Sequence, residues 1–270
     1  MTVPSVSDRI LAGYGKIETV PHFIVSKLTK QVGDVMLLYI IRHGEPDYAT
    51  DSLTELGRKQ ADALADRLCV HGFDEIYSSP LGRAIQTAQP TCERLGIPYK
   101  IEEWMSEDLA YDDLSAEREG GKRDWSFGCQ NTKLLEYAGQ NERSEWYDNP
   151  VFSTCRAAQV GYGRIKHCSD DFLSRLGYRR EGKIYRVVAP SDKRVAAFCH
   201  HGLGTSWLSH VLSIPPNIFW SSFNIAHSSI TVLEFSNNAD GRTAPQCVCL
   251  SDTSHIYKEG LGVNSPILGA

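Results

Sequence analysis

Arginine and histidine residues follow three of the predicted strands. They are Arg42-His43, Arg83 and His200-His201. An arginine offers a planar fork of N–H donors that matches an oxyanion, and an imidazole titrates near neutrality and acts as a nucleophile or base. The set therefore suits binding of, and attack on, an anionic group such as a phosphoryl group.

The first of these places follows the apolar run at 37–41, which is bounded by Gly44 and Pro46. Such a run is typical of a strand that is buried on both faces, as in parallel sheets. Parallel sheets hold their ligand sites just beyond the carboxyl ends of the strands. We therefore expect Arg42 and His43 to face a ligand.

The segments after this strand alternate between helix and strand. Thr54 is expected to cap a helix that Gly72 closes, and a second strand follows at 73–77. Ser79 is expected to cap the next helix, with Pro80 at its first position and Pro90 ending or kinking it. A third short strand is expected at 97–101.

The second half of the chain begins with a long segment, 102–190, which we interpret as a mainly helical insertion over the active-site end of the sheet. A strand at 195–199, a helix at 203–213 and a hairpin of strands at 229–235 and 246–250 follow. This order predicts a three-layer α/β/α sandwich with a mostly parallel central sheet. We expect residues 1–35 to form an N-terminal extension and 36–270 to form one domain.

Composition limits the classes of partner. The chain has 270 residues, 41% hydrophobic content and a net charge of −5, which indicates a globular protein and argues against a nucleic-acid surface. The eight cysteines are scattered, and we expect them to be reduced and mostly buried. Because neither a signal peptide nor a membrane span is recognisable, we expect a cytoplasmic protein with no membrane partner. The oligomeric state stays open, with a homo-oligomer among the options.

Four motifs resemble those of the histidine phosphatase superfamily, also called the phosphoglycerate mutase-like family, and they occur in the family's order. The motifs are Ile41-Arg42-His43-Gly44-Glu45, Leu53-Thr54-x-x-Gly57-x-x-Gln60-Ala61, Ser78-Ser79-Pro80-Leu81-x-Arg83-Ala84-x-Gln86-Thr87-Ala88 and Phe198-Cys199-His200-x-Gly202. The resemblance implies a phosphatase of a small-molecule phosphate monoester, a phosphoric monoester hydrolase that needs no metal and no cofactor.

The resemblance also implies roles for individual residues. His43 corresponds to the nucleophile that becomes a phosphohistidine, and Arg42 and Arg83 correspond to the arginines that hold the phosphoryl group. His200 corresponds to a further donor to the same oxygens. Its neighbour His201 is interpreted as a wall residue, because Cys199-His200-His201-Gly202 resembles the subgroup pattern C-H-F-G.

The proton donor is expected among the carboxylates that follow the third strand. Expulsion of an alkoxide needs an acid, and a carboxyl group with a raised pKa serves this role. Glu107 is the first choice because Trp104-Met105-Ser106-Glu107 resembles the family's L-x-E pattern. Asp108 and then Glu103 are the alternatives.

Other polar and aromatic residues have ordinary interpretations. His71 and His210 are expected to be structural or exposed. His227 precedes a strand and is a further candidate for the pocket. The tryptophans of the insertion suit core or lid packing, with stacking on an organic substrate as the alternative. No cluster of residues has the spacing of metal ligands.

Two other functions remain open. One is a cofactor-dependent phosphoglycerate mutase-like phosphotransferase, although the L-N-E-R-x-Y-G segment of those mutases is not found after the third strand. The other is a non-catalytic protein that binds a phosphorylated ligand. The complete set of Arg42, His43, Arg83 and His200 favours the enzyme.

Overall fold

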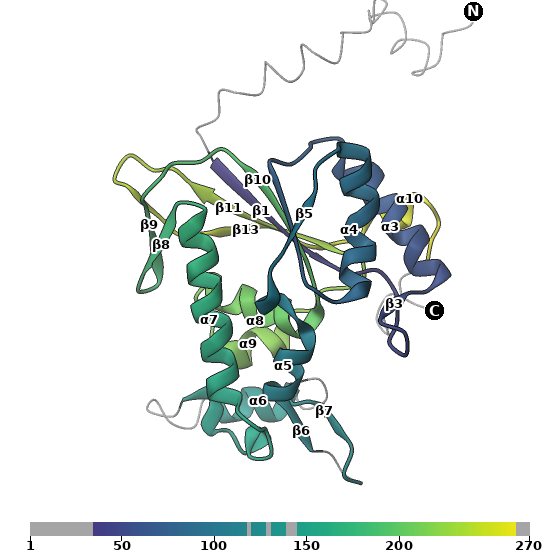
Figure 1. Cartoon of the computed structure of the whole chain (residues 1–270). Coiled ribbons are helices and arrows are strands. Elements are labelled where there is room, and N and C mark those ends of the chain that lie inside the picture. The colour runs from purple at the N-terminus through teal and green to yellow at the C-terminus, as the bar shows by residue number, and fades with distance from the viewer. Residues whose placement is uncertain (1–34, 118–119, 128–130, 139–144, 263–270) are drawn as a thin grey trace, which may run out of the picture. The chain divides into compact units, whose positions relative to one another are not determined.

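The computed structural model describes residues 35–117, 120–127, 131–138 and 145–262 (Figure 1). The following description concerns the unit Asp34–Ala270. The predicted N-terminal extension lies outside the described residues, except for Val35, which already belongs to the first strand.

A six-stranded sheet forms the centre of the described residues. Its strands, in spatial order, are β13 (Gln246–Asp252), β11 (Ile230–Ser236), β1 (Val35–Arg42), β10 (Arg194–Cys199), β4 (Glu75–Ser78) and β5 (Tyr99–Ile101). The four strands from β1 to β5 in this order are parallel to their neighbours, and β11 runs antiparallel between β1 and β13. The mixed, mostly parallel sheet that the sequence predicts is therefore confirmed.

Helices cover both faces of this sheet. Helices α3 (Glu55–Leu68) and α4 (Gly82–Leu95) pack over one face, and α7 (Ala158–Arg175) and α8 (His201–Val211) pack over the other. Strand β1 contributes to both cores, because Leu38 and Ile40 belong to one buried cluster and Ile41 to the other. These cores fix the position of Arg42, the last residue of β1.

The sequence predicts the start of α3 correctly, but it does not predict the start of α4 or its continuation past Pro90. Thr54 caps α3 as expected, since its hydroxyl accepts a hydrogen bond from the Gly57 amide. Helix α4 begins at Gly82, so the prediction that Ser79 caps it is wrong. The helix also continues past Pro90 to Leu95, because packing of its buried face outweighs the lost hydrogen bond.

Short elements complete the described part of the chain. They are β2 (Pro46–Asp47), β3 (Ser52–Leu53), η2 (Glu103–Met105), α5 (Glu107–Leu114), β6 (Ser115–Glu117), β7 (Arg123–Trp125), α6 (Asn131–Ala138), η3 (Trp146–Asp148), η4 (Pro150–Phe152), β8 (Tyr178–Glu181), β9 (Ile184–Val187), α9 (Pro216–Ser222), β12 (Arg242–Thr243) and α10 (Ser254–Lys258).

The segment 102–190 contains more strand than the sequence indicates. Besides α5, α6 and α7, it holds the hairpins β6–β7 and β8–β9. Strands of three or four residues are too short for the alternation of apolar and polar residues to be recognisable. Figure 1 shows α5, α6 and the β6–β7 hairpin together below the sheet.

The cysteines are less buried than predicted. The seven that the structure describes have free thiols, but only Cys92 and Cys199 are buried, and Cys247 is exposed on the edge strand β13. Cys129 lies outside the described residues. Within the described ranges, every helix falls short of the length and apolar character that a membrane crossing needs.

Candidate active site

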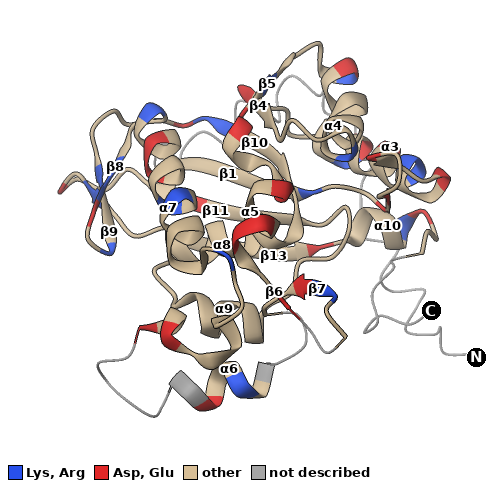
Figure 2. Cartoon of the chain, turned by 60° about the horizontal axis from the view of Figure 1, so that its bottom comes forward, with Lys and Arg blue, Asp and Glu red and all other residues tan. Residues whose placement is uncertain are grey.

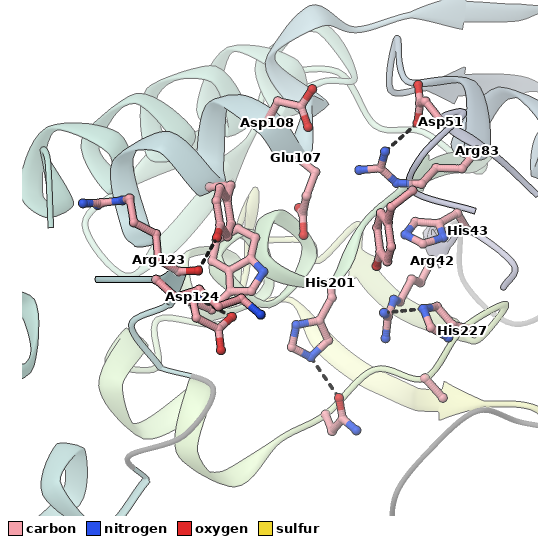
Figure 3. Close-up of a pocket in the computed structure, with 16 residues that line it drawn as sticks. Arg42, His43, Asp51, Arg83, Glu107, Asp108, Arg123, Asp124, His201 and His227 are labelled. Atoms are coloured by element: carbon pink, nitrogen blue, oxygen red, sulfur yellow. Dashed lines mark hydrogen bonds and ion pairs between the residues drawn. The ribbon is translucent and has the colours of Figure 1, made fainter. Parts of the chain in front are cut away.

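A cavity of about 1090 Å³ opens beyond the carboxyl ends of the parallel strands. The register aligns these ends, because Arg42 of β1 pairs with Cys199 of β10, and Phe198 pairs with Ser78 of β4. Four of the five residues predicted for catalysis line the cavity: Arg42, His43, Arg83 and Glu107. The fifth, His200, lies behind the wall, and its ring centroid is 5.1 Å from that of His43. Figure 3 shows the side chains of Arg42, His43, Arg83 and Glu107 around this space.

The backbone and ring of His43 are fixed from several sides. Its amide donates to the Cys199 carbonyl at 3.0 Å, and its own carbonyl accepts from the Ser228 amide at 2.9 Å. The ring atom Nδ1 lies 2.7 Å from the Gly44 carbonyl oxygen. Because a carbonyl only accepts, Nδ1 carries the proton, and the neutral ring keeps its lone pair at Nε2.

Burial favours the neutral form of the His43 imidazole. The side chain is 2% exposed. Burial lowers its pKa well below the ordinary 6.5, and the nearby His200 and Arg42 lower it further. A neutral imidazole with a lone pair at Nε2 is competent as a nucleophile without a separate base.

The guanidinium of Arg42 is oriented by the segment that precedes β11. Nη1 donates to the Ile225 carbonyl at 2.7 Å, and Nη2 lies 2.6 Å from His227 Nε2. Because arginine only donates, His227 accepts through Nε2. Burial lowers the pKa of Arg42, whereas Tyr48 and Glu107 raise it.

The guanidinium of Arg83 lies at the start of α4 and is 5% exposed. Its Nη1 donates to Asp51 Oδ1 at 2.5 Å. The ring of Tyr48 lies over the guanidinium, with 5.4 Å between its centroid and Cζ, in cation–π geometry. The two arginines thus approach the cavity from the end of β1 and from the first turn of α4, and both are held in place by neighbours.

The two adjacent histidines after β10 have different surroundings. His200 is fully buried, and its Nε2 lies 2.7 Å from Ser79 Oγ. Burial, Arg83 and Arg42 lower its pKa well below 6.5. His201 lines the cavity as a wall residue, with Nε2 at 2.9 Å from Asn224 Oδ1, and burial lowers its pKa to about 4.

Glu107 is bound to the beginning of α8. Its Oε1 and Oε2 accept from the amides of Gly202 and Leu203, each at 2.9 Å. Burial raises the pKa of this carboxyl group, although the two amides and the arginines oppose the rise. The alternative Asp108 also lines the cavity but is exposed, and Glu103 is exposed and absent from the cavity lining.

The sequence misses Tyr48 and Asp51 at the cavity, and it marks Trp125 and His227 only weakly. Tyr48 and Asp51 come from the β2–β3 hairpin, whose strands have two residues each. Trp125 comes from the β6–β7 hairpin. His227 also lines the cavity. The sequence indicates it as a candidate because it precedes a predicted strand. Pairing of such short strands leaves no periodic pattern in the sequence.

His71 and His210 are outside the cavity lining. His71 is exposed, and His210 is buried with Nε2 at 2.8 Å from Asp170 Oδ1. Within the described residues, no three His, Cys, Asp or Glu side chains are grouped so that they could hold a metal ion. The predicted independence from metals stays a prediction.

Part of the chain is similar in sequence to known proteins. The family model described as histidine phosphatase superfamily (branch 1) matches residues 38–117. A putative phosphoserine phosphatase 2 of Hydrogenobacter thermophilus is 32% identical over 123 residues, 42% of this chain and 54% of that protein. A probable phosphoglycerate mutase GpmB of Yersinia pestis is 27% identical over 124 residues, 40% of this chain and 58% of that protein. The match thus spans a little over half the length of these relatives.

Solved structures share the fold beyond the matched sequence. The phosphoserine phosphatase of Entamoeba histolytica, solved as a complex with phosphoserine, has a TM-score of 0.54 at 20% identity. The alignment covers 82% of this chain and 99% of that one. This structural likeness shows the fold alone. By sequence, residues 38–117, the part that carries Arg42, His43 and Arg83, match the histidine phosphatase superfamily, branch 1.

Proposed function

We propose that the protein hydrolyses a phosphate monoester of a small molecule through a phosphohistidine formed at His43. The hydrogen bond from His43 Nδ1 to the Gly44 carbonyl carries this proposal, because it leaves the lone pair on Nε2. Arg42 and Arg83 line the same cavity and provide two guanidinium forks for the phosphoryl oxygens.

The first step is transfer to the histidine. His43 Nε2 attacks phosphorus, the N–P bond forms, and the bond between phosphorus and the ester oxygen breaks. Arg42 and Arg83, which line the cavity, stabilise the charge on the phosphoryl oxygens. Glu107 gives its proton to the leaving oxygen, which departs as an alcohol.

The second step is hydrolysis of the phosphohistidine. Water attacks phosphorus, the carboxylate of Glu107 takes a proton from the water, and the N–P bond breaks. Inorganic phosphate leaves, and His43 returns to its neutral form. In this proposal, residues 36–270 act as one phosphatase domain and the segment 102–190 surrounds the leaving group.

The alternative is a mutase, in which a second hydroxyl group replaces water as the acceptor. Its support is the 27% identity to proteins named probable phosphoglycerate mutase. A neutral, fixed His43 serves either reaction equally well. The two reactions differ only in whether water or a hydroxyl group accepts the phosphoryl group.

The test is phosphate release from 4-nitrophenyl phosphate and from a panel of phosphorylated metabolites, with a chelator present. We expect turnover by the wild type and none by the variant His43→Ala. The variant His71→Ala is the matched control, because His71 is exposed and outside the cavity lining. Full turnover by His43→Ala would refute the proposal. Isomerisation of a phosphoglycerate primed by its bisphosphate would favour the mutase.

A further inference from the structure

Two buried polar residues outside the cavity lining hold the backbone beside His43. The Glu45 amide donates to Oε1 of Gln60, which belongs to α3 and is fully buried. The His43 carbonyl accepts from the amide of Ser228, which is also fully buried. Because neither Gln60 nor Ser228 lines the cavity, their effect on a reaction there must pass through this backbone.

Ser228 has a backbone conformation that needs support from its neighbours. Its φ is 59°, in the left-handed region that residues other than glycine rarely adopt. A strained backbone of this kind persists only where the surrounding contacts determine it. For Ser228 these contacts are the hydrogen bond of 2.9 Å to the His43 carbonyl and one of 3.1 Å between Oγ and His255 Nε2. His255 therefore fixes the residue that holds the His43 carbonyl.

The side chain of Gln60 forms a second connection to the same part of the chain. Its Oε1 accepts from the Glu45 amide at 2.8 Å, and its Nε2 donates to the Gly262 carbonyl at 2.8 Å. An amide that accepts through its oxygen and donates through its nitrogen has one orientation. Both connections thus lead from the backbone beside the nucleophile to residues 254–262, which we call the C-terminal segment.

The C-terminal segment is itself fixed on α3. It begins with α10, which lies beside α3 (Figure 1 and Figure 2). Arg67 of α3 donates to the Asp252 carboxylate and to Ser254 Oγ, at the start of α10. His255 is buried, and burial lowers its pKa to about 4, so the ring is neutral near neutral pH. The segment therefore gives His255 a fixed position from which it contacts Ser228.

The two phosphate-binding arginines are held by other contacts. Arg83 donates to Asp51, and Arg42 donates to the Ile225 carbonyl and to His227. These partners belong to neither connection with the C-terminal segment. The nucleophile and the phosphate-binding groups are thus positioned separately.

We propose that the C-terminal segment positions the nucleophile. His255 acts through Ser228 on the His43 carbonyl. The Gly262 carbonyl acts through Gln60 on the backbone amide two residues further on. Together the two connections set the direction of His43 Nε2 toward the phosphorus atom. This inference rests on the proposed function, because attack by Nε2 is the step that this backbone controls.

The test compares turnover of 4-nitrophenyl phosphate by two variants of His255. In His255→Leu we expect kcat/KM to fall about tenfold to a hundredfold, because a displacement of about 1 Å at a reacting group can cost ~10²-fold. His255→Gln keeps a group that hydrogen-bonds with Ser228 Oγ, so it should recover most of the activity. Tyr257→Ala is the control from the same helix, since Tyr257 is 89% exposed.

Binding of inorganic phosphate, measured by calorimetry, separates positioning from general damage to the cavity. The arginines determine this binding, so His255→Leu should leave the Kd for phosphate unchanged. Gln60→Leu breaks the other connection and should show the same loss of kcat/KM with unchanged phosphate binding. Lys59→Ala is its control, because Lys59 is an exposed residue of α3.

A double variant tests whether His255 acts through Ser228. Ser228→Ala and His255→Leu remove the two ends of one hydrogen bond, so their combination should cost no more than His255→Leu alone. Ser228→Ala removes a single oxygen atom, and it replaces His255→Leu in every comparison if the latter does not fold.

Two results would overturn the inference. One is a wild-type kcat/KM in His255→Leu. The other is a loss of phosphate affinity in that variant as large as its loss of kcat/KM. The His43 ring is also observed without turnover, by the NMR signals of its imidazole nitrogens, which are identified by their loss in His43→Gln. We expect these signals to shift in His255→Leu and to return in His255→Gln.

The NMR measurement distinguishes failure of this inference from failure of the proposed function. If the His43 signals respond as expected but the wild type hydrolyses no ester, the proposed function alone is refuted. If the wild type turns over and His255→Leu retains that turnover in full, this inference alone is refuted.

Discussion

The carboxylate of Asp51 joins the Arg83 guanidinium to the first turn of the helix that carries it. Oδ1 accepts from Arg83 Nη1 at 2.5 Å, and Oδ2 accepts from the Gly82 amide at 2.6 Å. Asp51 has a φ of 48°, in the left-handed region that a side chain rarely adopts. A Cβ on Gly82 would lie 2.3 Å from the Asp51 carbonyl oxygen, so only glycine permits this approach. The β2–β3 hairpin thus positions Arg83.

Removal of this carboxylate should impair catalysis through Arg83. In Asp51→Ala we expect kcat/KM for 4-nitrophenyl phosphate to fall about tenfold to a hundredfold, because a misplaced guanidinium binds the transferring group poorly. Asp47→Ala is the matched control from the same hairpin, since Asp47 bonds only locally, to Ala49 and Thr50. Unchanged steady-state kinetics in Asp51→Ala, with unchanged melting temperature, would contradict the positioning role.

The identity of the acid is tested by the leaving group. In Glu107→Gln we expect the rate for an alkyl phosphate to fall about 10²–10⁴-fold, because an alkoxide needs a proton to depart. The rate for 4-nitrophenyl phosphate should change far less, since nitrophenolate is a good leaving group. Asp108→Asn is the control, and it should treat both esters as the wild type does. If Asp108→Asn lowered the rate for the alkyl phosphate and Glu107→Gln did not, Asp108 would be the proton donor.

The pH dependence follows from two opposite pKa shifts. His43 must be neutral to attack, and its pKa is lowered well below 6.5, so activity persists when the pH falls below that value. Glu107 must be protonated to act as an acid, and its pKa is raised above 4.5, so activity falls as the pH rises through that raised value. Because these pKa values belong to the free enzyme, we expect kcat/KM for an alkyl phosphate to be highest on the acid side of neutrality. A kcat/KM that rises from acid through neutral pH would contradict this assignment.

His227 is expected to act through Arg42. Its Nε2 accepts from Arg42 Nη2 at 2.6 Å, and burial lowers its pKa to about 3, so it remains an acceptor near neutrality. In His227→Leu we expect kcat/KM to fall roughly tenfold or more, as for loss of a hydrogen bond to a charged group. His227→Gln keeps an acceptor and should recover most of the activity. If kcat/KM is the same in His227→Leu and His227→Gln, the hydrogen bond from Arg42 to His227 has no role in positioning Arg42.

The sequence predicts the strand ends because their residues carry strong local signals. The buried run before Arg42, the motif around Arg83 and the run before His200 each locate a strand, and the parallel sheet then brings their ends together. The cap at Thr54 is likewise local, since its acceptor bonds an amide three residues away. These features needed no knowledge of distant contacts.

The parts that the sequence does not predict depend on long-range packing. Asp51 reaches Arg83 through a hairpin of two-residue strands, and Trp125 reaches α8 through strands of three residues. The helix continues through Pro90 because Ala88, Thr91 and Cys92 are buried. Ser79 contacts His200 rather than capping a helix. In each case a contact between distant segments decides the outcome, so local propensity is a weak guide.

The most direct test of the central proposal is to trap the phosphorylated enzyme. Wild-type protein mixed with labelled phosphate ester is quenched in alkali, in which phosphohistidine survives, and the site of the label is identified by mass spectrometry. We predict label on His43, loss of that label when unlabelled substrate is added, and no label in His43→Ala. Phosphate release by the wild type with label on a different residue, or release by His43→Ala at the wild-type rate, would contradict the account.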